Sequence, residues 1–309
     1  MVEILLATYN GCLYIEELLQ SLIAQDYDEW ICTISDDGST DATINIVKKY
    51  IEKYPGYFRL LNLLPVHNAK NNFLNLLKNS TADYIMFCDQ DDVWLPKKIS
   101  TMIKEIEKRE LKNENSPILV FSDHIVANQN LELIADSFIN YSGYDSTRIH
   151  LNQLILENII SGCSCILNRS LAERANMYKN KEAIRWHDWW VALTAASTGK
   201  IYFINESLTL YRQHENNTVG VISSSGIKSS FERFSRLSYE AYRTTHNVII
   251  KQIRQAQELK NIEGIKDEWV PLIKDLVEIE KMNKIQRILC LFRYRICRNK
   301  RTIWTYFCV

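Results

Sequence analysis

The run Tyr84-Ile85-Met86-Phe87-Cys88 continues directly into Asp89-Gln90-Asp91-Asp92, so an apolar stretch ends in three closely spaced carboxylates. The apolar half predicts a buried strand, and the acidic half begins the loop at its carboxyl end. Carboxylates this close repel one another unless a cation lies between them, and hard divalent ions such as Mg²⁺ prefer oxygen ligands. The alternative is an exposed acidic turn, but such a turn does not usually continue into Val93-Trp94-Leu95-Pro96. We therefore predict a divalent metal site here.

Short apolar runs alternate with amphipathic stretches on both sides of this segment. We expect strands at residues 4–7, 30–34, 58–64, 84–88 and 118–121, and helices at 14–24, 41–54, 73–77 and 96–108. Alternation of this kind implies right-handed crossovers between parallel strands. The predicted fold class is therefore α/β, with a mainly parallel sheet flanked by helices. The mostly helical pattern of residues 229–296 predicts a C-terminal helical extension.

Two further polar clusters follow predicted strands, namely Thr8-Tyr9-Asn10-Gly11 and Ser35-Asp36-Asp37-Gly38-Ser39-Thr40-Asp41. Loops at the carboxyl ends of strands carry the ligands in open α/β sheets, so the three clusters are expected at one edge. Ser39, Thr40 or Asp41 can cap the helix that follows, but capping explains only one of the three acidic residues. An Asp here could instead accept a hydrogen bond from the imide N–H of uracil or thymine, or from a ribose hydroxyl.

Two clusters lie beyond the predicted sheet. In His187-Asp188-Trp189-Trp190, the carboxyl group of Asp188 lies beside two indoles, where its pKa should rise toward that of a general base. The alternative is that Asp188 lies at a helix N-terminus and the Trp pair lies in the core. The catalytic and the structural interpretations can both be true. In Tyr211-Arg212-Gln213-His214, an Arg suited to phosphate accompanies a His. On these residues alone, the pair has an equal chance of binding a metal or a diphosphate and of having only a structural role.

Composition and absent motifs exclude several classes. The 309 residues carry 37 basic and 37 acidic side chains, and this zero net charge argues against nucleic-acid binding over the whole surface. No G-x-G-x-x-G, G-x-x-x-x-G-K-[ST] or G-x-S-x-G motif is present, which disfavours the commonest dinucleotide, nucleoside triphosphatase and hydrolase sites. The eight cysteines form no C-x-x-C pair and are expected to be free thiols. With no signal peptide and no apolar run of about 18 residues, we expect a cytoplasmic protein.

Together these motifs resemble the family 2 glycosyltransferases with the GT-A (Rossmann-like) fold, and within them the bacterial rhamnosyltransferase-like group. The resemblance extends from Glu3 to about Gly220. The matching pieces are Ala7–Gly11, Ser35–Asp41, Asp89–Trp94, Asn158 with Gly162-Cys163, His187–Trp190 and Tyr211–His214. The group often has a glycine after the third strand, where this chain has Asn68-Ala69-Lys70-Asn71-Asn72, so no base contact is assigned to that loop.

The resemblance implies a role for each motif. The donor nucleotide would contact Thr8, Tyr9, Asn10, Asp36 or Asp37, Asp89 and Arg212. Asp89 and Asp91 match a D-x-D motif, with Asp91 as direct ligand of Mg²⁺ or Mn²⁺ and His214 completing the coordination. Asp188 matches the catalytic base, and the acceptor side is assigned to Trp94, Trp189 and Trp190.

The implied activity is inverting, metal-dependent transfer of a sugar, with rhamnose a candidate, from a dTDP- or UDP-sugar. The acceptor would be a growing, lipid-linked surface or capsular polysaccharide. One alternative is a sugar-1-phosphate nucleotidyltransferase, which would need a glycine-rich basic loop where Ala7–Gly11 has one Gly and no Lys or Arg. Another is an inactive carbohydrate-binding subunit of a polysaccharide assembly complex, which would have no electrostatic reason to keep every acidic cluster.

The chain is expected to divide into a GT-A domain at 1–222 and a helical C-terminal region at 223–309, with Ser223-Ser224-Ser225-Gly226 as the linker. Residues 281–309 contain eight Lys or Arg, no Asp or Glu, and many apolar side chains, among them Ile303, Trp304 and Phe307. This composition predicts an amphipathic tail that holds the protein at the inner face of the cell membrane. The alternative is that these helices pack on the sheet domain and their basic faces are solvated.

Overall fold

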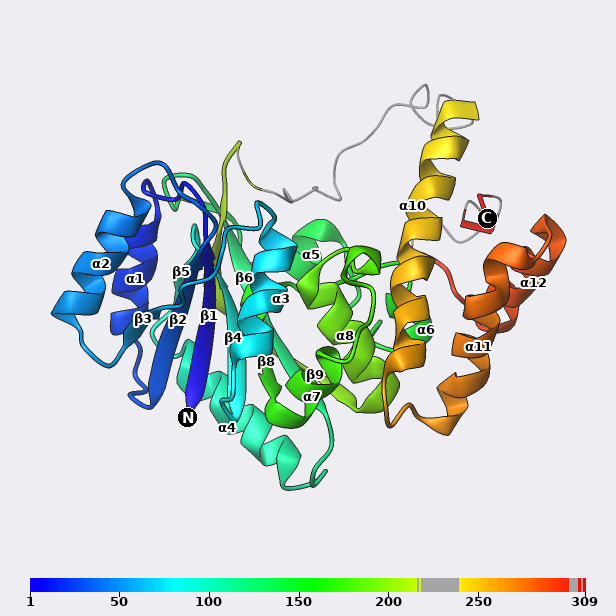
Figure 1. Cartoon of the computed structure of the whole chain (residues 1–309), viewed down its shortest axis with the longest axis horizontal. Helices are drawn as coiled ribbons and strands as arrows, with labels where there is room; N and C mark the ends of the chain where they lie inside the picture. The colour runs from blue at the N-terminus through cyan, green and yellow to red at the C-terminus, as the bar shows by residue number, and fades with distance from the viewer. Residues whose placement is uncertain (216, 218–238, 300–304, 307) are drawn as a thin grey trace.

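Nine strands of the described residues form one mixed sheet in the computed structural model (Figure 1). The structure describes residues 1–215, 217, 239–299, 305–306 and 308–309. The strand order is β3-β2-β1-β4-β8-β6-β9-β5, with β7 paired to β6. The strands are β1 (Val2–Thr8), β2 (Trp30–Asp36), β3 (Phe58–Leu60), β4 (Tyr84–Asp89), β5 (Val93–Trp94), β6 (Ile118–Asn128), β7 (Leu133–Ala135), β8 (Cys165–Asn168) and β9 (Lys200–Gln213).

The helices alternate with these strands as the sequence predicts. They are α1 (Ile15–Ile23), α2 (Thr43–Lys53), α3 (Ala69–Asn79), α4 (Lys98–Glu110), α5 (Phe138–Ser142), α6 (Leu151–Leu154), α7 (Arg169–Ala175), α8 (His187–Thr198), α10 (Tyr239–Gln257), α11 (Val270–Glu278) and α12 (Lys284–Arg293). The α/β class and the C-terminal helices are confirmed. The strand predicted over 58–64 ends at Leu60, because Pro65 and its neighbours turn away toward the β2–α2 loop.

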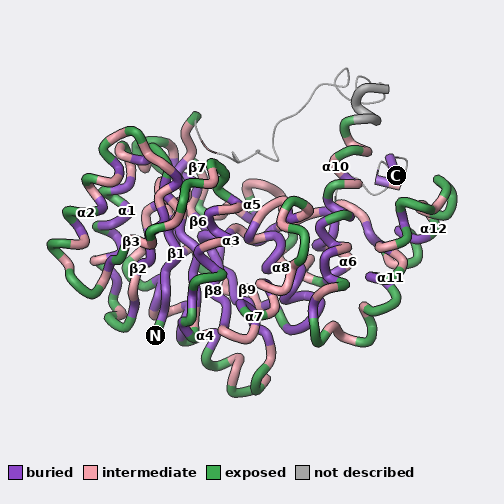
Figure 2. The backbone as a smooth tube through the Cα atoms, viewed as in Figure 1, coloured by how far each residue is buried: buried purple, intermediate pink, exposed green. Residues whose placement is uncertain are grey.

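Helices cover both faces of the sheet, which explains why the central strands β1 and β4 are mainly apolar rather than alternating. In β1, Ile4 and Leu6 face the core shared with α1, α2 and α4, whereas Leu5 faces the core shared with α3, α7 and α8. The strands form the buried centre of the tube in Figure 2. A strand buried on both faces leaves only its ends accessible, so polar chemistry is restricted to the loops.

The parallel register places the predicted clusters at one edge. Strand β1 lies between β2 and β4, with Thr8 opposite Asp36 and Ala7 opposite Asp89. The three polar loops therefore start side by side, as expected for the carboxyl ends of parallel strands.

The C-terminal helices share the core of the face that α3, α7 and α8 cover. Ile249, Leu272, Leu276 and Leu291 are fully buried members of that core. Among the helices of the described residues, none combines the length and the apolar character that crossing a membrane requires. The predicted linker Ser223–Gly226, the boundary at 222/223, and the tail residues Ile303, Trp304 and Phe307 lie outside the described residues.

Gly199 joins α8 to β9 where there is no room for a side chain. A Cβ at this position would lie 1.8 Å from the carbonyl oxygen of Pro117, and that oxygen accepts a hydrogen bond from Lys200 N at 2.9 Å. We expect Gly199→Ala to lower the free energy of unfolding by about 3 kcal/mol, the upper end for overpacking. Urea unfolding would measure this loss.

Gly56→Ala is the matched control. Gly56 has a φ of +95°, and a Cβ placed on it would have no heavy atom within 4 Å. Its substitution should therefore cost only the strain of the backbone, about 1 kcal/mol. Equal losses from the two substitutions would mean that the contact with Pro117 is not what limits position 199.

Candidate active site

The loops after β1 and β2 are bonded to each other. Thr8 Oγ1 donates to Asp36 Oδ1 at 2.8 Å, and Asn10 Oδ1 accepts from Thr40 N at 2.8 Å. The other carboxylate oxygen of Asp36 accepts from the backbone N–H of Gly38 and Ser39. Both carboxylate oxygens of Asp36 are thus bonded to Thr8 and to its own loop. Of the two predicted nucleoside contacts, Asp37 lines the cleft described below and Asp36 does not.

The carboxylate of Asp37 fixes the loop between β3 and α3. It accepts hydrogen bonds from the backbone N–H groups of Val66, His67 and Asn68, at 2.5, 2.8 and 2.7 Å. His67 has a φ of +49°. Where the related group often has a glycine, this chain therefore holds the loop through Asp37, and His67 and Asn68 line the cleft beside it.

A cleft of about 1090 Å³ lies at the carboxyl edge of the sheet. Its walls come from the carboxyl ends of β1, β2, β4 and β9 and the loop between β3 and α3, from α5 and residues 156–162 after α6, from the start of α8, and from the C-terminal region. Of the predicted site residues it contains Thr8, Tyr9, Asn10, Asp37, Asp89, Asp91, Asp188, Trp189 and His214. The backbone of Tyr9 exchanges two hydrogen bonds with the Gln90 amide, both 2.9 Å long, which ties the first loop to the acidic run.

The acidic run has one accessible side and one buried side. Asp89 and Asp91 line the cleft, whereas Asp92 is fully buried and its Oδ1 accepts from Arg212 N at 3.2 Å. Burial, together with the charges of Asp91 and Asp188, raises the pKa of Asp89 to about 7. Burial and the charges of Asp91 and Asp89 also raise the pKa of Asp92. These carboxylates therefore sit where a cation would be strongly favoured.

Two residues to which the sequence assigned no role lie behind the acidic run. Ligand atoms of Asp89, Asp92 and Cys163 all lie within 4.8 Å of one another, a grouping able to hold a metal ion. Lys98 is fully buried, and its Nζ donates to Cys163 O at 2.5 Å and to Thr209 Oγ1 at 2.7 Å. Its charge lowers the pKa of both Asp89 and Asp92 against the larger effect of burial. A lysine in a helical pattern is normally solvated, so the sequence carried no signal for it.

Asp91 and His214, the two predicted metal ligands, meet across 123 residues of chain. His214 Nε2 lies 2.8 Å from Asp91 Oδ2. The imidazole stacks on Tyr14, with ring centroids 4.7 Å apart and an angle of 24° between the planes, and Asn217 donates to the same carboxylate at 3.4 Å. Carboxylate oxygens suit Mg²⁺ and Mn²⁺, and an imidazole nitrogen is a further ligand type for a transition metal. The two groups are bonded to each other here, so a metal bound by both would replace this direct contact.

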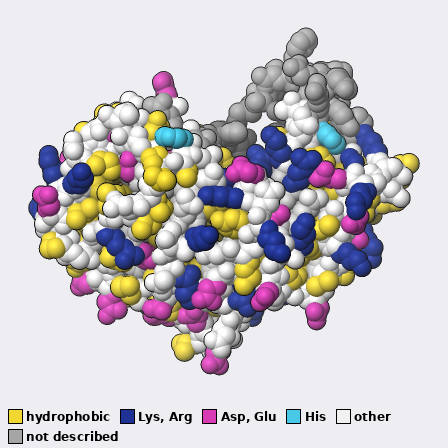
Figure 3. Space-filling view, viewed as in Figure 1, with side chains coloured by type: hydrophobic (Ala, Val, Ile, Leu, Met, Phe, Trp, Pro, Cys, Tyr) yellow, Lys and Arg dark blue, Asp and Glu magenta, His cyan; other side chains and the backbone are white. Residues whose placement is uncertain are grey.

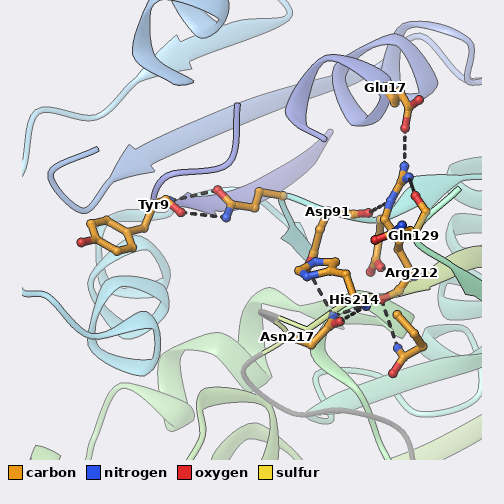
Figure 4. A network of polar contacts seen from close by, with 10 residues as sticks. Tyr9, Glu17, Asp91, Gln129, Arg212, His214 and Asn217 are labelled. Atoms are coloured by element: carbon orange, nitrogen blue, oxygen red, sulfur yellow. Dashed lines mark hydrogen bonds and ion pairs between the residues drawn. The ribbon is translucent and has the colours of Figure 1, made fainter. Parts of the chain in front are cut away.

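The prediction that Arg212 contacts the donor diphosphate is wrong in this structure. The side chain is 2% exposed and does not line the cleft. Its guanidinium donates to the carbonyl oxygens of Asp91 and Gln129 at 2.7 and 2.6 Å and pairs with Glu17 (Figure 4). It also lies over the ring of Tyr14 at 4.7 Å. Because these contacts use its planar donors, Arg212 fixes the acidic run to β9 instead of binding a ligand.

Asp188 lies in the first turn of α8, so the helix N-terminus and the site coincide. Its Oδ1 accepts from Trp189 N at 2.6 Å and its Oδ2 from Gly162 N at 3.2 Å. Burial raises the pKa of Asp188 to about 6, against the lowering effect of these backbone bonds. The predicted upward shift of the pKa is confirmed. A carboxylate with this pKa is ionised at neutral pH and is still basic enough to take a proton.

Two of the three tryptophans assigned to the acceptor side lie in the core. Trp94 is 2% exposed beneath the cation of Lys98, 3.6 Å from the ring centroid, and Trp190 is fully buried with its Nε1 donating to Ala175 O. Neither lines the cleft, so their assignment to the acceptor is wrong. Trp189 does line it, with its Nε1 donating to Leu154 O at 2.6 Å.

Comparison with known proteins assigns the chain to a family. The model of glycosyl transferase family 2 matches residues 3–175, more than half of the chain. The dTDP-rhamnosyl transferase RfbG of Shigella flexneri is 31% identical over 250 residues, which cover 77% of this chain and 81% of that protein. The putative glycosyltransferase EpsE of Bacillus subtilis is 28% identical over 123 residues, covering 40% of this chain and 44% of that protein.

Solved structures agree on the fold. S. aureus TarS 1-349 in complex with UDP has a TM-score of 0.56 and 18% identity, covering 99% of this chain and 88% of that one. The mannosyltransferase PcManGT from Pyrobaculum calidifontis, in complex with GDP-Man and Mn²⁺, has a TM-score of 0.53 and 14% identity, covering 95% and 73%. Both likenesses support the GT-A fold. With the family match and the identity to RfbG, they establish that the chain belongs to glycosyl transferase family 2 and is a glycosyltransferase.

Proposed function

We propose that the enzyme transfers a sugar, with inversion and with a divalent metal, from a dTDP- or UDP-sugar to a saccharide. One observation carries this proposal: the Asp91–His214 pair and the carboxylate of Asp188 line the same cleft, and the charge of Asp188 raises the pKa of Asp89. A ligand site for a metal and a basic group are therefore close together. The relative RfbG is a dTDP-rhamnosyl transferase, which makes dTDP-rhamnose the first donor to test.

Asp91 and His214 are the residues that would hold Mg²⁺ or Mn²⁺. The metal, when bound, neutralises charge that develops on the departing nucleoside diphosphate. The chain supplies the positions of these ligands. Arg212 and Tyr14 fix the backbone of Asp91 and the ring of His214, so neither ligand has to be ordered when the donor arrives.

Asp188 is the base in this mechanism. Its carboxylate takes the proton of the acceptor hydroxyl, whose oxygen attacks the anomeric carbon from the side opposite the leaving group. The backbone N–H groups of Trp189 and Gly162 hold the carboxylate in one orientation. Gly162 is required for this contact, because a Cβ there would lie 2.8 Å from His187 Nε2.

The two alternatives fit the site less well. A nucleotidyltransferase would need cations at the first loop, where the backbone N–H groups of Tyr9, Asn10 and Gly11 are already bonded to Gln90, Ser39 and Thr43. An inactive carbohydrate-binding subunit would not need a carboxyl group with a pKa near 6 beside three further carboxylates.

The C-terminal region carries the proposed contact with a membrane and a lipid-linked acceptor. On α12, Ile285, Leu289 and Phe292 are 71%, 60% and 68% exposed, and their spacing places them on one face of the helix. The opposite face buries Cys290 and Leu291. Lys281, Lys284, Arg293 and Arg295 lie near this stripe in the sequence and are exposed, and of these Lys281 pairs with Glu278 and Arg293 with Asp275. Several Lys and Arg side chains lie over the C-terminal helices on the right of Figure 3.

An apolar stripe bordered by cations suits an anionic lipid surface at the inner face of the cell membrane, where each Lys or Arg adds about 1 kcal/mol. A lipid-linked polysaccharide would be presented at that surface. The two sequence-based alternatives for the tail are therefore compatible, because one face of α12 packs on the protein and the other is exposed.

The metal is tested first. With Mn²⁺ or Mg²⁺, the purified protein should release nucleoside diphosphate from one member of a panel of dTDP-, UDP- and GDP-sugars. EDTA or Asp91→Ala should reduce this release at least about 100-fold, because the metal supplies several kcal/mol of transition-state stabilisation. Asp83→Ala, which removes an exposed carboxylate, is the control. Full turnover in EDTA would rule out metal dependence.

The base is tested through pH. Because the pKa of Asp188 is about 6, its carboxylate is protonated and inactive below that pH. With saturating metal, whose charge keeps Asp89 ionised, we expect kcat/KM to fall about tenfold per pH unit below pH 6 and to be constant above it. Asp188→Asn should remove this acid limb and lower kcat at least about 100-fold, with donor affinity little changed. Asp28→Asn on the surface is the control, and an unchanged acid limb in Asp188→Asn would assign the titration to another group.

Membrane contact is tested with vesicles of phosphatidylglycerol. The full-length protein should co-sediment at low salt and be released as salt rises. Replacing Ile285, Leu289 and Phe292 together by Ser should weaken partitioning at least about 10-fold, since three apolar side chains lose their contact with lipid. Leu64→Ser with Leu111→Ser, two leucines that are 88% and 89% exposed elsewhere, is the control. Sedimentation of both variants alike would show that α12 is not the contact.

A further inference from the structure

Three residues of the C-terminal region line the cleft and have no place in the mechanism above. They are Gln252 on α10, and Arg298 and Asn299 after α12. Arg298 joins these segments, because it bonds both Gln252 of α10 and Leu156, the first of the cleft-lining residues 156–162 that follow α6. The cleft is therefore completed by segments that follow the family-matched residues 3–175 by more than 70 positions.

The chain at Cys297–Asn299 is firmly attached to the cleft wall. Arg298 Nε donates to Leu156 O at 3.3 Å, and Asn299 N donates to Glu157 Oε2 at 3.1 Å. From the other side, Arg148 Nη2 donates to Cys297 O at 2.8 Å, and its Nε lies 3.7 Å from Glu157 Oε2. This part of the wall is thus built before a ligand binds, which lowers the entropy lost on binding.

Gln252 gives this part of the cleft a fixed hydrogen-bond donor. Its side chain is 4% exposed, and its Oε1 accepts from Arg298 Nη2 at 3.1 Å, so the orientation of the amide is set. Among the described residues the N–H group of the other amide atom, Nε2, has no protein acceptor, and because the side chain lines the cleft it can donate to the oxygen of a bound ligand.

Part of the cleft wall is aromatic. Tyr144 and Trp186 are both partly buried and line the same cleft as Gln252, Glu157 and Arg298. The charged groups here already have partners. Glu157 contacts Arg148 and the backbone N–H of Asn299, and Arg298 donates to Leu156 and Gln252. Aromatic faces with a few fixed polar groups suit a molecule that has both apolar C–H faces and uncharged hydroxyls, which describes a sugar ring.

We infer that Gln252 and Arg298 of the C-terminal region, with Tyr144 and Trp186, form the subsite for the acceptor saccharide. Gln252 Nε2 donates to an acceptor hydroxyl, Arg298 holds the amide in position, and the two aromatic side chains contact the ring. This assignment rests on the proposed function. It adds that acceptor specificity resides in the C-terminal region, whereas the donor is bound by the loops of the sheet.

The test is Gln252→Glu, which keeps the oxygen that accepts from Arg298 and replaces the donor by a second oxygen. The probes are methyl glycosides of hexoses, deoxyhexoses and N-acetylhexosamines, each scored by how far it stimulates release of nucleoside diphosphate from the donor that the wild-type protein hydrolyses. We expect Gln252→Glu to raise the KM for a stimulating glycoside at least about 10-fold. The glycoside-independent hydrolysis of the donor and the melting temperature should change little.

Gln286→Glu is the matched control, because it makes the same change outside the cleft at a capping-box position that accepts Glu. An unchanged glycoside KM in Gln252→Glu, or the absence of stimulation by any glycoside in the wild type, would overturn the saccharide subsite. A loss of donor hydrolysis in Gln252→Glu would also overturn it, since the residue would then act on the donor or the fold. Absence of donor hydrolysis in the wild type would instead refute the proposed transferase activity itself.

Discussion

Repulsion among carboxylates is the constraint around which this site is built. The charges of Asp91 and Asp188 raise the pKa of Asp89, and those of Asp89 and Asp91 raise the pKa of Asp92. The parallel register of β1 with β2 and β4 brings these groups to one edge, and burial then increases the cost of their charges. The fold compensates with backbone N–H donors and with two buried cations, Lys98 and Arg212, neither of which lines the cleft. The accessible side, formed by Asp89 and Asp91, is where the proposed metal would bind.

Much of this arrangement follows from local pattern. Each apolar run that ends in polar residues became a strand with its loop at the same edge, because a strand covered on both faces exposes only its ends. The raised pKa of Asp188 followed from the two indoles beside it in the sequence, whereas the pairing of Asp91 with His214 was expected only from the family resemblance. The nucleoside contacts of Thr8, Tyr9, Asn10 and Asp37 remain predictions, although all four line the cleft.

The failures have a common physical reason, which is that a side chain's direction depends on partners far away in the chain. Arg212 alternates with cleft-lining Tyr211 along β9, so its guanidinium points to Glu17 and Gln129, which no local pattern reveals. Trp94 and Trp190 were assigned to the acceptor side because they belong to the motifs that carry the family resemblance. A two-residue strand and a helical step of about 100° instead direct their rings into opposite cores. The burial of Lys98 was not predicted, because it depends on hydrogen bonds to Cys163 and Thr209, which are distant in the sequence.

The C-terminal helices connect these local sites. Ile249, Leu272 and Leu291 belong to the same core as α8, whose first turn carries Asp188. Packing that buries one face of α12 therefore also positions Arg298, five residues beyond its end, against the cleft wall. The opposite face of α12 is the exposed stripe of Ile285, Leu289 and Phe292. The buried face of α12 therefore belongs to the core that carries the proposed base, its exposed face carries the proposed lipid contact, and the chain that follows it reaches the proposed acceptor subsite.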